Sequence, residues 1–301
     1  MMDDNERLAR VSEEYARTGS IALAEAVKQG AANQDPGGPR RFTLLDFASI
    51  TPSSEPEYTI KGLLPRSGLA VVWGAPKSGK SFWVFDAVMH VALGWFYHGR
   101  KVVPGPVVYG AFEGAAGFKK RVEAFRRERL AEDHTPPPFY LLPEMLDLVN
   151  DHEHLVERIR DQLAPNVPRV VILDTLNRSL AGSESSDQDM TAYVRAADAI
   201  KHAFGCCVII VHHGPHDGTR PRGHGSLVGA LDAQIAVSAI GNAHKAVVEL
   251  AKDGEAGAQI TFNLKQVEVG ADSDGDVVTS CVAESADPPE DHTDRRLTPN
   301  Q

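Results

Sequence analysis

An eight-residue stretch constrains the fold of this chain more than any other feature. An apolar, β-branched run (Leu69 to Trp73) precedes it directly, and a run with helical character (Phe82 to Leu93) follows it. The glycines of such a stretch let the backbone curl so that its N–H groups point at phosphate oxygens, and the helix behind it adds the positive end of its dipole. This order predicts a strand, a phosphate-binding loop and a helix, rather than a glycine turn that merely joins two elements. The stretch reads Gly74-Ala75-Pro76-Lys77-Ser78-Gly79-Lys80-Ser81.

The last two residues of this loop have the side chains that a nucleoside triphosphate requires. Lys80 is placed to bridge the β- and γ-phosphates, and the Ser81 hydroxyl is placed to bind Mg²⁺. The sequence therefore predicts ATP and Mg²⁺ as ligands of residues 74–81.

The rest of the chain predicts an α/β fold. Short apolar runs alternate with helical patterns, which is typical of a mainly parallel twisted sheet flanked by helices. Two later segments, Ala246 to Ala251 and Gln259 to Val269, surround a turn at 252–255 and predict an antiparallel extension at the sheet edge. The apolar runs are Leu69 to Trp73, Val107 to Phe112, Val170 to Leu173, Val208 to Val211 and Ile235 to Ser238.

Composition suggests three regions and a cytoplasmic protein without a membrane partner. We expect an N-terminal arm and linker over residues 1–41, partly helical or disordered, an ATPase domain over 42–270, and a disordered tail over 271–301. No apolar run approaches the roughly 18 residues of a membrane span, and the three cysteines suit neither a disulfide framework nor a zinc site. The net charge of -10 means that any contact with nucleic acid must come from local basic loops.

Two further apolar runs end in acids. Asp174 closes the run that starts at Val170, as expected of a residue that holds the magnesium shell, although an aspartate also commonly caps the turn after a buried strand. Glu113 closes the run that starts at Val107 and is the candidate base for the water that attacks the γ-phosphate. Its alternative is an acid stabilised by the N-terminus of the following helix.

Paired histidines, His212 and His213, close another run. An imidazole at this place could hydrogen-bond the γ-phosphate and report its presence to the loop that follows. A histidine without a catalytic role is the alternative for either residue.

The order of these motifs resembles the RecA-like P-loop ATPases, and most closely the RepA-type plasmid replicative helicases. The resemblance covers about residues 55 to 268 and implies a RecA-like core. The motifs that carry it are Tyr58 to Pro65, Gly74 to Ser81, Gly110 to Gly114, Leu173 to Leu176, the His212-His213 pair and Arg222 to Ser226.

This resemblance implies a ring, expected to be a hexamer, that hydrolyses Mg-ATP and translocates on single-stranded DNA. It implies ATP sites at subunit interfaces, where a basic residue of the neighbour reaches the γ-phosphate; Lys252 is the best match, although the family uses arginine there and a solvated lysine in a hairpin turn is the alternative. Arg220 and Arg222, in a glycine-rich loop after the histidines, are the candidate DNA contacts. The other loop expected to face the channel, 177–189, is acidic and rich in serine, apart from Arg178.

A second reading belongs to a different class of function. The chain could be an ATP-dependent DNA-binding switch or a recombination mediator that assembles on DNA or a partner without unwinding it. A kinase is a third reading, disfavoured because the sequence contains no recognisable acceptor pocket or lid.

Overall fold

The computed structural model describes residues 44–52, 54–130, 135–214, 225–252 and 254–287. Residues 1–53 and 54–301 form two separate units. In the first unit, residues Phe47–Ser49 form the 3-10 helix η1, whose preceding residue Asp46 accepts hydrogen bonds from the Ala48 and Ser49 N–H groups. The predicted arm at 1–41 lies outside the described residues.

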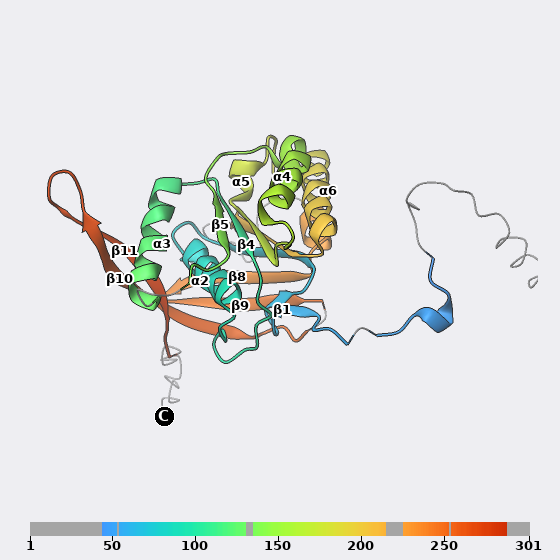
Figure 1. Cartoon of the computed structure of the whole chain (residues 1–301), viewed down its shortest axis with the longest axis horizontal. Helices are drawn as coiled ribbons and strands as arrows, with labels where there is room; N and C mark the ends of the chain where they lie inside the picture. The colour runs from blue at the N-terminus through green and yellow to red at the C-terminus, as the bar shows by residue number, and fades with distance from the viewer. Residues whose placement is uncertain (1–43, 53, 131–134, 215–224, 253, 288–301) are drawn as a thin grey trace, which may run out of the picture. The chain divides into compact units, whose positions relative to one another are not determined.

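In the described part of the second unit, a nine-stranded sheet runs in the order β11-β10-β9-β8-β3-β7-β6-β4-β5 (Figure 1). A separate pair, β1 (Tyr58–Ile60) and β2 (Leu64–Pro65), is antiparallel. The strands of the large sheet are β3 (Gly68–Gly74), β4 (Val107–Ala111), β5 (Phe139–Leu142), β6 (Val170–Asp174), β7 (Cys207–His213), β8 (Ala233–Ile240), β9 (Ala243–Ala251), β10 (Gln259–Ala271) and β11 (Val277–Ser285).

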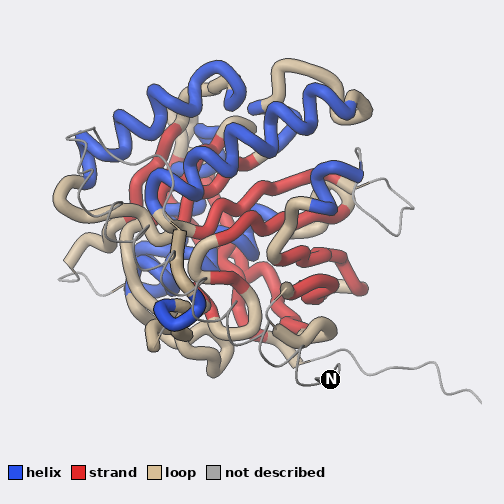
Figure 2. Tube along the Cα trace, turned by 90° about the vertical axis from the view of Figure 1, so that its right-hand side faces the viewer, coloured by secondary structure: helices blue, strands red, loops and turns tan. Residues whose placement is uncertain are grey.

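Helices cover both faces of the parallel strands (Figure 2). On β3, Ala70 and Val72 pack with α2 and α3, whereas Leu69 and Val71 pack with α4 and α6. Successive side chains of a strand point to opposite faces, so this strand is buried throughout. The helices are α2 (Lys80–Leu93), α3 (Ala115–Arg129), α4 (Leu148–Leu163), α5 (Leu176–Ser179), α6 (Asp187–Phe204) and α7 (Gly225–Gly229). Among the described helices, none combines the length and apolar character that a membrane crossing requires.

The parallel strands place the motif residues at one edge of the sheet. β3, β4, β6 and β7 all run in the same direction, so their carboxyl ends meet there. β7 lies between β3, which leads into residues 74–81, and β6, which ends at Asp174. The predicted α/β fold is confirmed: the sheet is mainly parallel, with helices on both faces and an antiparallel extension.

The extension consists of β9, β10 and β11, and it begins by pairing β9 antiparallel to β8. Its hairpin of β10 and β11 projects past the parallel strands and lies beside α3 (Figure 1). Arg127 and Arg129 of α3 donate hydrogen bonds to the carbonyls of Glu268 and Ala283, respectively. These contacts tie the hairpin to a helix of the parallel half.

The expectation of a disordered tail from residue 271 was wrong for residues 277–285, which form β11. The polar stretch that suggested disorder is a turn, in which Asp272 accepts hydrogen bonds from the N–H groups of Asp274 and Asp276. After the turn the chain returns along β10, and Val282 and Ala283 enter the core. Residues 288–301 lie outside the described part of the chain.

Candidate functional site

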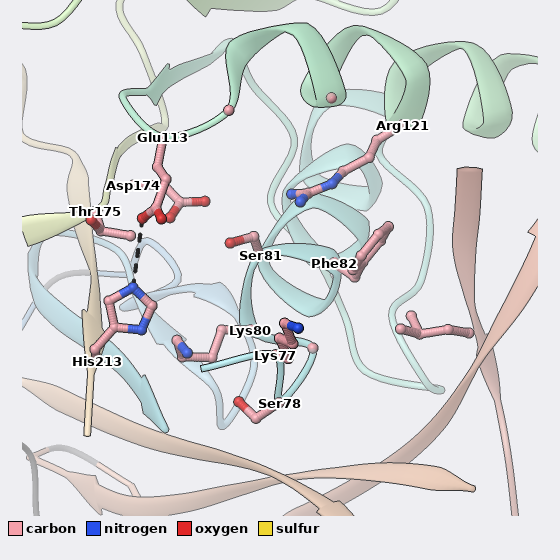
Figure 3. Close-up of a pocket in the computed structure, with 14 residues that line it drawn as sticks. Lys77, Ser78, Lys80, Ser81, Phe82, Glu113, Arg121, Asp174, Thr175 and His213 are labelled. Carbon is pink, nitrogen blue, oxygen red and sulfur yellow. Dashed lines mark ion pairs between the residues drawn. The ribbon is translucent and has the colours of Figure 1, made fainter. Parts of the chain in front are cut away.

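A cavity of about 500 Å³ opens at the carboxyl edge of the parallel strands. It is built from the phosphate loop, the ends of β4, β6 and β7, one face of α3, and β10 (Figure 3). Most of the residues singled out from the sequence therefore meet in one place. The lining residues are Lys77, Ser78, Gly79, Lys80, Ser81, Phe82, Glu113, Gly114, Gly117, Arg121, Asp174, Thr175, His213 and Leu264.

Two glycines give the loop its shape. Gly74 has φ 155°, and a Cβ there would lie 2.1 Å from the Val237 carbonyl oxygen of β8. Gly79 caps the start of α2 with φ 90°, a region that side chains other than glycine rarely adopt. The loop therefore packs tightly against β8 and then turns into the helix, which leaves the helix N-terminus facing the cavity.

Lys80, the first residue of α2, is buried, and its Nζ donates hydrogen bonds to the carbonyls of Gly74 (3.0 Å) and Ala75 (2.8 Å). Burial lowers the pKa of Lys80, while the nearby carboxylates of Asp174 and Glu113 act in the opposite direction. The ammonium group is held inside the loop, at the position expected for a phosphate ligand.

Asp174 ends β6 and is 6% exposed. Its Oδ2 accepts a hydrogen bond of 2.7 Å from the Tyr109 hydroxyl of β4. Burial raises the pKa of Asp174, against hydrogen bonds from Tyr109 and Ser81 and the positive charge of Arg121. A carboxylate so buried needs cationic or hydrogen-bonding partners, and this cavity contains both kinds.

Glu113 and His213 lie next to one another at the ends of β4 and β7. The distance between Glu113 Oε2 and His213 Nε2 is 3.6 Å, and half of the Glu113 side chain is exposed. His212, by contrast, is 1% exposed and shares its face of β7 with Val208 and Ile210, which pack beneath α4 and α6. Of the two histidines, His213 is thus the one that lines the cavity.

Arg121 of α3 is a site residue that is absent from the candidates drawn from the sequence. Its guanidinium carbon lies 4.3 Å from the centroid of the Phe82 ring, and the side chain reaches from α3 toward the cavity (Figure 3). The sequence signal was the spacing of Gly114, Gly117 and Arg121, because residues three and four apart share one face of a helix. All three line the cavity.

The candidate residues for subunit and DNA contacts are not in this cavity. Lys252 follows β9 at the amino edge of the sheet, where its Nζ lies 3.2 Å from Asp232 Oδ1 and its N–H donates to the Asp232 carbonyl. Asp232 also accepts a hydrogen bond from the Leu69 N–H at the start of β3. Arg220 and Arg222 lie outside the described residues.

The cavity also offers ligands for Mg²⁺. The described residues contain no cluster of three or more His, Cys, Asp or Glu side chains suited to a metal. Ser81 and Asp174 nevertheless present a hydroxyl and a carboxylate, and Mg²⁺ is usually bound by one or two such oxygens together with water and substrate phosphates. These residues therefore fit an ion that is held jointly with a nucleotide.

Comparison with known proteins gave a family and a similar structure. The family model described as an AAA domain matches residues 38–219, more than half of the chain. A crystal structure of the RadB recombinase is similar at 15% sequence identity, with a TM-score of 0.48, over 67% of this chain and 90% of the RadB chain. No curated protein matched the sequence significantly.

Proposed function

The chain belongs to the AAA domain family, and from this premise we propose that it is an ATPase that uses Mg²⁺. The observation that carries the proposal is the cavity itself, which brings Lys80, Asp174 and Glu113 together at the ends of three strands that are separate in sequence. A turn that only bound phosphate would not require two acids, Asp174 and Glu113, beside it.

The chemistry follows from the positions of these groups. Lys80 neutralises charge on the β- and γ-phosphate oxygens, and Arg121, held over Phe82, adds a second positive charge from the α3 side. Ser81 and Asp174 would hold Mg²⁺, which supplies further positive charge to the transferring phosphoryl group. Transition-state charge is stabilised here by groups that are already oriented before the reaction.

Glu113 is the base in this proposal. It has an exposed carboxylate on the cavity wall, where it can orient the attacking water and accept its proton. His213 lies 3.6 Å from Glu113 and precedes the segment 215–224 in the sequence by two residues. A hydrogen bond between His213 and the γ-phosphate would therefore act on the backbone that leads into that segment.

We further propose that ATP hydrolysis drives movement on single-stranded DNA by a ring, most simply a hexamer of the RepA type. The support is the order of the sequence motifs, from residue 58 to residue 226. In such a ring Lys252 would serve the site of a neighbouring subunit, after release from its ion pair with Asp232, and Arg220 and Arg222 would contact the DNA backbone.

One observation favours the alternative, an ATP-dependent switch that does not unwind DNA. The loop between α5 and α6, one of the two expected to face a ring channel, carries Glu184 and precedes the acidic first turn of α6 with Asp187 and Asp189. Negative charge repels a phosphate backbone. This loop therefore gives no support to the motor hypothesis. The DNA contacts of a motor would have to come from residues 220–222.

The test is ATP turnover with and without single-stranded DNA, combined with native mass determination and a Lys80→Ala control. We expect turnover that the Lys80→Ala variant lacks, because the loop then loses the buried ammonium group proposed to bind the phosphates. Turnover that DNA stimulates in an assembled ring would support the motor. Lys80-dependent turnover that is indifferent to DNA, in a monomer or dimer, would contradict it and leave an ATP switch.

A further inference from the structure

The antiparallel extension contributes to the nucleotide cavity, although it lies beyond residue 219, where the family match ends. Leu264 of β10 lines the cavity directly. His244 of β9 and Phe262 of β10 lie behind the phosphate loop and contact Ser78 and Gly79. None of these three residues belongs to a motif of the parallel half.

His244 makes a specific contact with the loop backbone. Its Nδ1 lies 2.9 Å from the Ser78 carbonyl oxygen, so the imidazole donates a hydrogen bond when Nδ1 carries the proton. A Cβ on Gly79 would lie 3.0 Å from the same nitrogen. The ring thus packs against two consecutive residues of the loop.

Phe262 fixes the imidazole in this position. The two rings are stacked, with centroids 5.1 Å apart and planes 21° from parallel, and His244 and Phe262 are paired in the β9–β10 register. Phe262 is fully buried in the core. The imidazole is therefore supported on one side by the core and meets the phosphate loop on the other.

The consequence for phosphate binding follows from the planarity of the peptide bond. The Ser78 carbonyl and the Gly79 N–H belong to one peptide unit, and in a trans peptide these two groups point in opposite directions. A hydrogen bond that holds the Ser78 carbonyl toward β9 also directs the Gly79 N–H away from β9. Gly79 lines the cavity, where its N–H can meet a phosphate oxygen.

We propose that His244 is a positioning residue of the nucleotide site, which orients the Ser78–Gly79 peptide for phosphate binding. This inference rests on the proposed function. It makes the antiparallel extension a working part of the ATPase, because residues 38–219 alone would lack the contact that holds the phosphate loop from behind.

Two substitutions separate the hydrogen bond from the ring stacking. His244→Asn retains an N–H donor near the position of Nδ1, and His244→Phe retains an aromatic ring on Phe262 but has no donor. We expect the Kd for Mg-ATP, measured by calorimetry on the full chain, to rise about fivefold in His244→Phe, the usual contribution of one hydrogen bond. In His244→Asn it should stay within about twofold of the wild-type value, since the donor remains.

Lys245→Ala, on the same strand, is the matched control and should bind like the wild type. Thermal unfolding without nucleotide shows whether any variant is simply less stable. Unchanged binding in His244→Phe would overturn the proposal, and so would equal losses in both His244 variants that follow their loss of stability. A wild-type chain that binds ATP without hydrolysing it would contradict the proposed activity, while the binding comparison would still test His244.

Discussion

The large sheet has a parallel half, which consists of β3 to β8, and an antiparallel half, which is the extension of β9, β10 and β11. The two halves contribute to the candidate site in different ways. The parallel half supplies charged groups at or just beyond the carboxyl ends of its strands: Lys80, Glu113 and Asp174. The antiparallel half supplies uncharged contacts from within its strands: Leu264 as cavity wall and Phe262 beneath the ring of His244.

The difference has a physical cause. A residue at a strand end is followed by a loop or helix start, where water and backbone N–H groups can satisfy a charge. His244, Phe262 and Leu264 instead lie within strands and are half-buried or buried. In this cavity the charged groups accordingly come from the parallel half. The antiparallel half can hold those groups in place. Substitutions in the parallel half should therefore have larger effects on the reaction than substitutions in the antiparallel half.

The largest effect is expected at Glu113. Glu113→Gln keeps the shape of the side chain but removes the base, so ATP turnover should fall about a hundredfold or more while ATP binding remains. Single-turnover hydrolysis together with calorimetric binding measures both quantities. Glu153→Gln, at an exposed position on α4, is the control. Turnover of the Glu113 variant near that of this control would show that Glu113 is not the base.

Substitution of Arg121 tests whether the guanidinium on α3 acts on ATP together with the charged residues of the parallel half. Arg121→Ala removes the guanidinium that lies over Phe82, and kcat/KM for ATP should fall about thirtyfold, as for the loss of a hydrogen bond to a charged group. Arg121→Lys should recover part of this, because a lysine carries the charge without the planar fork. Lys120→Ala, exposed on the same helix, should leave kinetics unchanged, and an equal loss there would point to the general charge of α3.

Asp86 of α2 tests the cost of a buried charge away from the strand ends. Burial raises its pKa to about 7, opposed by the positive charge of Arg129, and its Oδ1 has no hydrogen-bond partner among the described residues. The native state thus keeps a proton that the unfolded chain releases above its ordinary pKa near 3.8. Stability from this group is present at low pH and is lost as the pH rises toward 7.

We therefore expect the stability of the wild type, relative to Asp86→Asn, to fall by about 1 kcal/mol between pH 6 and pH 8. Urea unfolding of both proteins across this range measures the difference, and Asp151→Asn on α4 serves as a control for the loss of an aspartate from a helix. A wild type and an Asp86→Asn variant with parallel pH profiles would contradict a raised pKa of Asp86 in the native state.

Local patterns were sufficient for the parallel half. The glycine-rich stretch at 74–81, the helix behind it and the strands ending in Glu113 and Asp174 each follow from residues close in sequence. The pairing of β9 with β10 was also predicted. By contrast, β5 and β11 were missed as strands, because both lie at sheet edges and are only partly buried, which weakens the alternation of apolar and polar residues.

The sequence alone determined that this chain forms an α/β core with a phosphate loop, because strand, loop and helix propensities act over a few neighbouring residues. Only the tertiary structure decided that His213 lines the cavity while His212 does not, that Arg121 points into it, and that His244 holds the loop from the rear. Each of these depends on a partner distant in sequence, such as Glu113 for His213, Phe82 for Arg121 and Ser78 for His244. Such partners come into contact only when the sheet has assembled, so no local sequence pattern predicts these contacts.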